Sequence, residues 1–147
     1  MPLDTSRPEI TQALTRGVCR FLTESAITPL REFKLASKRR ADVAGLDEKG
    51  RFTIVEVKSS PADFLADNKW PDYLEFCEQY YFAVAEDFPR DILPADQGLI
   101  IADGYGAEIV DEAEARKVNA TRKKSLTLNF ARTAANRLHQ LADPETR

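Results

Sequence analysis

The sequence predicts a mixed α/β fold in which one helix, three strands, a second helix, further strands and a final helix follow one another. Three observations lead to this prediction. Apolar residues recur at helical spacing in residues 11–24 and 121–142, residues 39–58 are typical of a β-hairpin, and a strong helix start follows at residues 60–63. A meander of strands followed by a helical crossover implies a mixed sheet with helices on both faces. The chain length of 147 residues suits a single domain that spans residues 1–147.

Six strands are expected from runs of apolar and β-branched residues that are bounded by turn residues. They cover residues 28–35, 39–47, 51–58, 80–85, 98–102 and 107–110. Glu48, Lys49 and Gly50 form the loop of the hairpin, because a loop of this length usually ends in a left-handed residue and Gly50 suits that place. The register that follows pairs Asp47 with Arg51.

Three helices are expected, at residues 11–24, from residue 60 to about residue 79, and at residues 121–142. Ser60 can cap the second helix and Pro61 fits its first turn, whereas Pro71 is expected to interrupt it. The third helix has one apolar face, which carries Phe130, Ala134, Leu138 and Leu141.

The composition restricts the class of protein. Hydrophobic residues make up 43% of the chain and charged residues 31%, values that are typical of a water-soluble domain. No apolar run approaches the roughly 18–20 residues that span a bilayer, and the N-terminus lacks a secretory signal, so we expect a cytoplasmic protein without membrane contact. The net charge of −3 argues against a protein that coats nucleic acid, although a local basic strip suffices for a DNA enzyme.

Any metal site is expected to use oxygen ligands. Cys19 and Cys77 stand in apolar surroundings on predicted helices, where we expect small buried thiols. His139 is the only histidine, which argues against a histidine-rich zinc site. A bound metal is therefore expected to be Mg²⁺ or Mn²⁺.

An acidic residue followed two positions later by lysine occurs four times in the sequence. Asp47–Lys49 falls in a turn, Asp67–Lys69 falls in a predicted helix, and Glu32–Lys34 follows no strand that carries an aspartate. Only Glu56–Lys58 ends a β-rich strand that comes after another strand with an acid, Asp42.

The hairpin register places Asp42 directly opposite Glu56. Opposed Cβ atoms lie about 4.5–5.5 Å apart, so the two carboxylates repel each other unless a cation or a proton lies between them. Lys58 is on the same strand face as Glu56, where its ammonium would orient a water or offset charge on a phosphate. The alternative interpretation is a salt-bridge cluster at the sheet edge, made by Arg40 together with these three residues.

Asp42, a 13-residue gap and Glu56-Val57-Lys58 resemble the PD-(D/E)XK nuclease signature. More narrowly, residues 11–142 resemble the MmcB family of bacterial DNA repair proteins. The stretches that carry this resemblance are Arg39–Asp42, Val55–Ser60, Asp63, Phe64, Asp67, Lys69–Tyr73, Tyr81–Val84 and Gly98–Ile100. The resemblance implies a restriction endonuclease-like fold, with an αβββαβ core, flanking helices and an additional C-terminal helix.

The resemblance also implies a metal site. Asp42 and Glu56 would bind Mg²⁺ with help from the backbone carbonyl of Val57, and Lys58 would complete the catalytic set. Ala41 stands where the superfamily signature has a proline. Glu32 is our candidate for a third metal-binding acid, and the alternative is an exposed strand carboxylate.

Several residues near the motif are candidates for contact with DNA. Lys69 and Tyr73 are four residues apart and resemble the Gln-x-x-x-Tyr element of some of these nucleases, with lysine in place of glutamine. Lys69 would contact phosphate, and the alternative is a solvated lysine beside a core tyrosine. Trp70 would stack on a base or else anchor the core. The remaining candidates are Arg39, Arg40 and Ser60.

A second basic cluster, at residues 116–124, would either track a DNA backbone or form a solvated face. Taken together, these features predict a divalent-metal-dependent DNA endonuclease that acts in repair. The alternative is a catalytically inactive nuclease-like module that binds DNA or a repair protein. A second copy of the chain, in a homodimer, is a further candidate partner.

Overall fold

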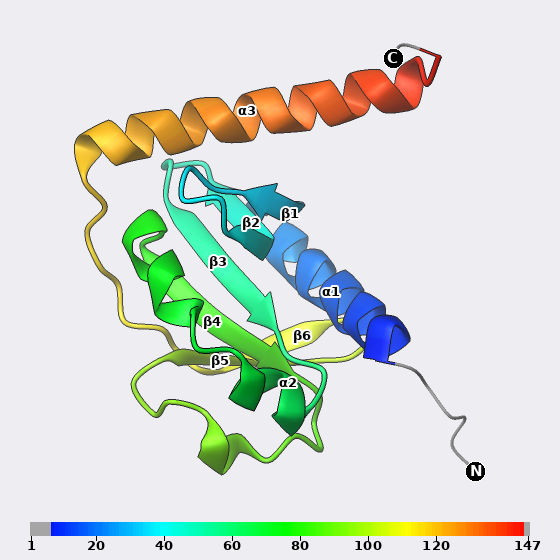
Figure 1. The fold of residues 1–147 in the computed structure, drawn as a ribbon, viewed down its shortest axis with the longest axis vertical. Helices are drawn as coiled ribbons and strands as arrows, with labels where there is room; N and C mark the ends of the chain where they lie inside the picture. The colour runs from blue at the N-terminus through cyan, green and yellow to red at the C-terminus, as the bar shows by residue number, and fades with distance from the viewer. Residues whose placement is uncertain (1–6, 146–147) are drawn as a thin grey trace.

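The computed structural model describes residues 7–145, and it contains a six-stranded mixed sheet with helices packed on it (Figure 1). The elements in chain order are α1 (Arg7–Glu24), β1 (Ile27–Lys34), β2 (Arg40–Asp47), β3 (Phe52–Val57), α2 (Pro61–Ala66), the 3₁₀ helix η1 (Trp70–Phe76), β4 (Gln79–Val84), the 3₁₀ helix η2 (Arg90–Ile92), β5 (Gly98–Ala102), β6 (Ala107–Asp111) and α3 (Ala120–Ala142).

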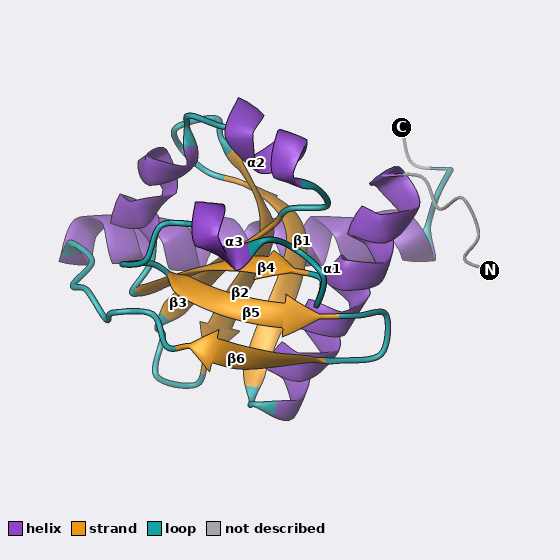
Figure 2. Cartoon of the chain, turned by 90° about the horizontal axis from the view of Figure 1, so that it is seen from below, coloured by secondary structure: helices purple, strands orange, loops and turns teal. Residues whose placement is uncertain are grey.

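The strands lie in the sheet in chain order, from β1 at one edge to β6 at the other. β1, β2 and β3 form an antiparallel meander, β3, β4 and β5 run parallel, and β6 returns antiparallel beside β5 (Figure 2). The connection from β3 to β4 passes through α2 and η1, because parallel neighbours need a crossover. The predicted αβββαβ core with a C-terminal helix is therefore confirmed, and it is consistent with a restriction endonuclease-like fold.

Apolar side chains fill both faces of the sheet. On one face α1 packs through Val18 and Leu22 against Val43 and Val55. On the other face α2, η1 and the first half of α3 cover an aromatic core. Its buried aromatic members include Phe33, Phe52, Phe64, Tyr73, Phe76, Tyr80, Phe82 and Phe130. This second face also carries the acidic motif, so the site lies against an aromatic layer.

The β2–β3 hairpin has the predicted register. Asp47 donates its backbone N–H to the Arg51 carbonyl, and Gly50 has a φ of 81°, the left-handed conformation that its lack of a Cβ permits. The ladder continues to Val43 opposite Val55. One further step along both strands brings Asp42 opposite Glu56, as the sequence predicted.

The second helix is shorter than expected. Ser60 caps it by accepting the Asp63 N–H, and Pro61 stands in its first turn, as predicted. It ends at Ala66 because Asp67 takes an extended conformation and its carboxylate accepts the Lys69 N–H, a local bond that competes with helical hydrogen bonding. The chain then continues as η1 rather than as α-helix, so the break comes before Pro71.

The other two helices also differ in detail from the prediction. α1 begins at Arg7 instead of residue 11. α3 matches its expected bounds, but only its first half buries side chains in the core, namely Leu126 and Phe130, whereas the second half contacts β1 through the Arg137 guanidinium. Leu138 and Leu141 are 68% and 81% exposed, and Figure 1 shows this half of α3 extending past the sheet.

Both cysteines are free thiols in the core, as predicted. Cys19 belongs to α1, and Cys77 follows η1. Within residues 7–145, no helix has the length and apolar character needed to cross a membrane.

Candidate metal and DNA site

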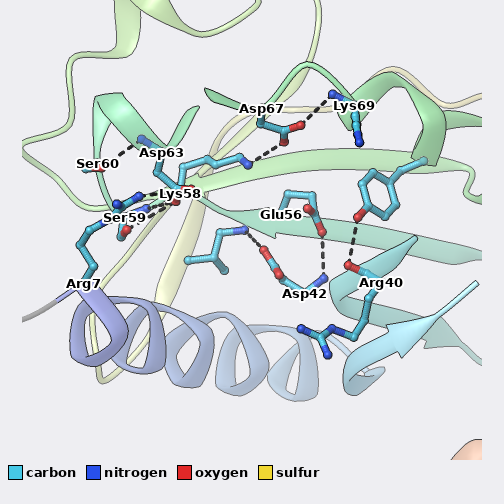
Figure 3. Close-up of polar contacts among 12 residues, drawn as sticks. Arg7, Arg40, Asp42, Glu56, Lys58, Ser59, Ser60, Asp63, Asp67 and Lys69 are labelled. Atoms are coloured by element: carbon cyan, nitrogen blue, oxygen red, sulfur yellow. Dashed lines mark hydrogen bonds and ion pairs between the residues drawn. The ribbon is translucent and has the colours of Figure 1, made fainter. Parts of the chain in front are cut away.

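Asp42 and Glu56 are held by hydrogen bonds that cross between β2 and β3 (Figure 3). The Glu56 Oε2 atom accepts the backbone N–H of Asp42 at 2.8 Å. The Asp42 Oδ2 atom in turn accepts the backbone N–H of Val57 at 2.8 Å. Each carboxylate thus replaces a ladder bond at the end of the paired strands, which keeps the two acids side by side.

Both carboxyl groups are hard to ionise. Glu56 is only 5% exposed, and burial, followed by the nearby Asp42 carboxylate, raises the pKa of Glu56 well above its usual value. Burial also raises the pKa of Asp42, although the Val57 N–H and the Lys58 ammonium act in the opposite direction. Glu56 is buried and Asp42 is half-buried, so ionising both adjacent carboxyl groups is unfavourable, and a proton or a cation stabilises the pair.

Lys58 is buried directly after β3, and its ammonium is paired with Asp67. The Nζ atom lies 2.7 Å from Asp67 Oδ2, and the Lys58 backbone donates to the Ala83 carbonyl. Burial is the largest single influence on Asp67 and acts to raise its pKa, but the hydrogen bond and charge of Lys58 and the backbone N–H groups of Lys69 and Trp70 together outweigh burial, so the pKa of Asp67 is lowered. Figure 3 shows the Lys58 side chain directed towards Asp67, while Glu56 is directed towards Asp42.

The predicted alternative, a salt-bridge cluster of the motif residues with Arg40, does not form. Lys58 pairs with Asp67 instead, and Arg40 pairs with Glu32 at 3.4 Å. The two motif carboxylates accept backbone N–H groups rather than cationic side chains.

Glu32 is not gathered with the other two acids. The β1–β2 pairing passes from Arg31 opposite Val43 to Phe33 opposite Ala41, so Glu32 stands unpaired beside Asp42 with a positive φ of 48°. Its carboxylate is exposed in the ion pair with Arg40. Within the described part of the chain, no group of three or more histidine, cysteine or acidic side chains could hold a metal. Metal binding by Glu32 stays a prediction.

The donor set suits Mg²⁺ better than a transition metal. Mg²⁺ commonly binds to one or two carboxylates, keeps several waters and takes further oxygen ligands from a phosphate. Asp42 and Glu56 supply two such carboxylates, and the Val57 carbonyl is the third protein oxygen that we expect there.

The basic candidates lie around the rim of the site. Arg40 is exposed, and Arg39 pairs with Asp72 at 3.2 Å. Lys69 is exposed and immediately precedes η1. Because η1 is a 3₁₀ helix with three residues per turn, Lys69 and Tyr73 do not share a face in the way an α-helix would have arranged them.

The other three candidates for DNA contact are also part of the local structure. Trp70 is half-buried, with its ring centroid 5.9 Å from that of Tyr80 and 5.3 Å from that of Phe82, as the core-anchor alternative predicts. Tyr73 is buried and donates its hydroxyl to the Arg40 carbonyl at 3.0 Å. Ser60 caps α2.

The second basic cluster is partly bound to acids of this chain. Arg122 pairs with Glu75 and covers the ring of Phe76, and Lys123 pairs with Glu78. These contacts favour a role in attaching α3 to η1 over a free DNA-tracking surface.

Two residues near the motif were missed in the sequence. Asp67 belongs to an acid-x-lysine triplet that was set aside because it was assigned to a helix, yet it holds the motif lysine. Tyr80 is buried on β4 and has a hydroxyl without a hydrogen-bond partner among the described residues. Only the parallel pairing of β3 and β4 brings Tyr80 near Glu56, and no local motif in the sequence predicts that pairing.

Residues 2–145 match the model of the protein family described as DNA repair protein MmcB-like. The chain belongs to this family. The MmcB-like prediction is therefore confirmed, and membership links the protein to DNA repair and hence to DNA.

A solved structure of a protein of unknown function from Silicibacter pomeroyi is also similar. It is 46% identical, the match covers 99% of this chain and 97% of that one, and the TM-score is 0.89. No curated protein matches. The fold is thus shared over almost the whole chain.

Proposed function

We propose that this MmcB-like protein is a divalent-metal-dependent DNA endonuclease that acts in DNA repair, with Mg²⁺ or Mn²⁺ held by Asp42 and Glu56. One observation carries the proposal. The two acids lie side by side with raised pKa values, and among the described residues no cationic side chain is paired with either carboxylate. This repulsion is a cost in a purely structural site, whereas a bound cation would relieve it.

The bound metal would supply Lewis acidity and an activated water for phosphodiester hydrolysis. Asp42, Glu56 and the Val57 carbonyl would hold it. The attacking water would lose a proton as its oxygen bonds to phosphorus, the bond to the leaving oxygen would break, and that oxygen would take up a proton. Lys58 would donate a hydrogen bond to a phosphate oxygen or orient the water as negative charge develops.

The cations around the site would hold the DNA backbone. Arg40 and Lys69 are exposed and Arg39 is half-buried, and each would make a sequence-independent phosphate contact. Ser60, Trp70 and Tyr73 are tied into the fold, so we assign them to supporting this surface, with direct contact limited to their exposed edges.

A cleavage assay tests the proposal. The protein is incubated with branched, nicked, single-stranded and duplex DNA in the presence of Mn²⁺ or Mg²⁺, beside Asp42→Ala. Asp111→Asn is the matched control, because Asp111 is an exposed acid on β6 at the far edge of the sheet. We expect the wild type and the control to cut at least one substrate and Asp42→Ala to cut none. Cleavage by Asp42→Ala at the wild-type rate would refute the mechanism.

A catalytically inactive module that binds DNA or another repair protein is the second candidate. It is favoured by the position of Lys58, which is tied to Asp67, and by Glu32, which is turned away from the two acids. The same assay separates the candidates, because a binding module retains DNA without cutting it. Its partner, or a second copy in a homodimer, would find exposed apolar residues at Leu138 and Leu141.

A further inference from the structure

Tyr80 lies next to the proposed metal site but forms no hydrogen bond there. It stands on β4 opposite Ile54 of β3, and the next residues on the same faces, Phe82 and Glu56, are also opposite each other. Tyr80 is only 1% exposed, and its hydroxyl has no partner among residues 7–145. A buried hydroxyl without a partner is costly, so a protein that keeps one needs a reason for it.

The ring of Tyr80 is fixed on several sides. It stacks on Trp70 at 5.9 Å with an interplanar angle of 22°, and on Tyr73 at 6.3 Å with an angle of 19°. Phe82 meets it edge-on, with centroids 5.2 Å apart. Because the ring is closely packed by these aromatic side chains, the hydroxyl is held in one place, away from solvent.

After burial, the two largest electrostatic influences on Tyr80 come from acids of the site. Burial is the main cause of a strongly raised pKa of Tyr80, and the Glu56 carboxylate is the next, followed by Asp67. The phenol therefore stays neutral at physiological pH and can act only as a hydrogen-bond donor or acceptor, not as an anion. A neutral donor that the strand pairing holds on the same face of the sheet as Glu56, one side-chain repeat away along the strands, has the properties of a group that supports a metal ligand.

We propose that Tyr80 is a positioning residue of the metal site, whose hydroxyl donates a hydrogen bond to the Glu56 carboxylate when that carboxylate holds Mg²⁺. The inference rests on the proposed function, and it adds the residue that orients the ligand. Carboxylates that bind metals are generally hydrogen-bonded by a second layer of residues, and losing such a partner typically lowers metal affinity about 10–100-fold.

The rival interpretation is that the Tyr80 hydroxyl is never used. Replacing tyrosine by phenylalanine then removes only an unsatisfied oxygen, which would raise the melting temperature of the metal-free protein and leave Mg²⁺ binding unchanged. The two interpretations differ in Mg²⁺ affinity, which can be measured without DNA and without activity.

The test compares Tyr80→Phe with Tyr81→Phe in the full chain. Tyr81 is a neighbouring buried tyrosine whose side chain lies on the opposite face of β4, in the core formed with α1. Calorimetric titration with Mg²⁺ should show a dissociation constant raised about 10-fold or more for Tyr80→Phe and unchanged for Tyr81→Phe.

A second measurement on the wild type guards against a folding defect in the variant. With tyrosine labelled with ¹³C at the hydroxyl-bearing carbon, the Tyr80 resonance should shift on addition of Mg²⁺ and the Tyr81 resonance should not. If the wild type binds Mg²⁺ but the Tyr80 signal and the Tyr80→Phe affinity do not change, the inference is wrong and the metal site stands. A wild type that binds neither Mg²⁺ nor Mn²⁺ overturns both.

Discussion

The backbone N–H of Asp42 donates a 2.8 Å hydrogen bond to the Glu56 carboxylate, so the acid of β3 is anchored to β2 at the residue that carries the other acid. This bond keeps the two carboxylates close even in the absence of a cation. Burial and this proximity both raise the pKa of Glu56. The two carboxylates therefore repel each other in the metal-free protein, and removing one of the two charges should stabilise the fold.

Asp42→Asn should raise, or at least not lower, the melting temperature of the EDTA-treated protein. The asparagine amide oxygen can still accept the Val57 N–H, so only the charge is lost. Mg²⁺ should stabilise the wild type alone. With a dissociation constant near ~1 mM and ~10 mM metal, mass action gives about 1.4 kcal/mol, or roughly 3–6 °C. The metal site would be refuted if metal-free Asp42→Asn had a clearly lower melting temperature than the wild type, and if neither Mg²⁺ nor Mn²⁺ changed the melting temperature of the wild type.

The advantage of Asp42→Asn in EDTA should depend on pH. Asp42 and Glu56 have raised pKa values in the folded protein, so the cost of ionising them is fully present above those values. It disappears as pH falls through them towards the unfolded values near ~4. Melting curves at several pH values should thus show that Asp42→Asn exceeds the wild type in melting temperature most at neutral pH, and that this difference disappears on acidification. A difference that widens as the pH falls would contradict the raised pKa values.

The part of the site that could be predicted is the part fixed by a short hairpin. Gly50 determines the loop, the loop determines the register, and the register places Asp42 opposite Glu56. Asp67 and Tyr80 could not be predicted, because their positions depend on where α2 ends and on the parallel pairing of β4 with β3.

Glu32 illustrates a second limit. It was chosen as a third acid because it lies on the strand beside Asp42, and the strand pairing does place it there. Its positive φ turns the carboxylate to Arg40, and a glutamate gives no sequence signal for that conformation. The Arg137 guanidinium donates to the Glu32 carbonyl, so a helix more than a hundred residues away along the chain supports the turned backbone.

Lys58→Ala should abolish metal-dependent DNA cleavage while the protein remains folded. The reason is the loss of the cation beside the phosphate, and Asp42→Ala and Glu56→Ala should have the same effect on cleavage. Gel assays for activity and circular dichroism for folding check the prediction. Full cleavage by Lys58→Ala would show that the lysine has no catalytic role.

Neutralising Arg39 and Lys69 should weaken binding to all DNA sequences similarly. The slope of log affinity against log salt should flatten by nearly one unit for each phosphate that is no longer neutralised. Arg51→Ala is the matched control, since Arg51 lies at the opposite end of β3 and pairs with Asp47. Fluorescence anisotropy at several salt concentrations gives both quantities. Unchanged affinity and slope would assign both residues to a solvated face.

Asp67→Asn should destabilise the protein by about 2 kcal/mol, or roughly 4–8 °C, because it leaves the buried Lys58 ammonium without its charged partner. The pKa of Asp67 is lowered in the folded protein, so its stabilising effect is complete above the unfolded value and is lost as pH falls through the folded one. The difference in melting temperature between the wild type and Asp67→Asn should therefore hold from neutral pH to about pH 5 and shrink below about pH 4. The wild type is the more stable protein here, which is the opposite of the expectation for Asp42→Asn.

Asp72→Asn is the control, because its ion pair with Arg39 is largely exposed and is worth at most about 1 kcal/mol. Equal losses for the two variants would mean that the Lys58–Asp67 pair is no more than a surface salt bridge, and that Lys58 is free to move without Asp67.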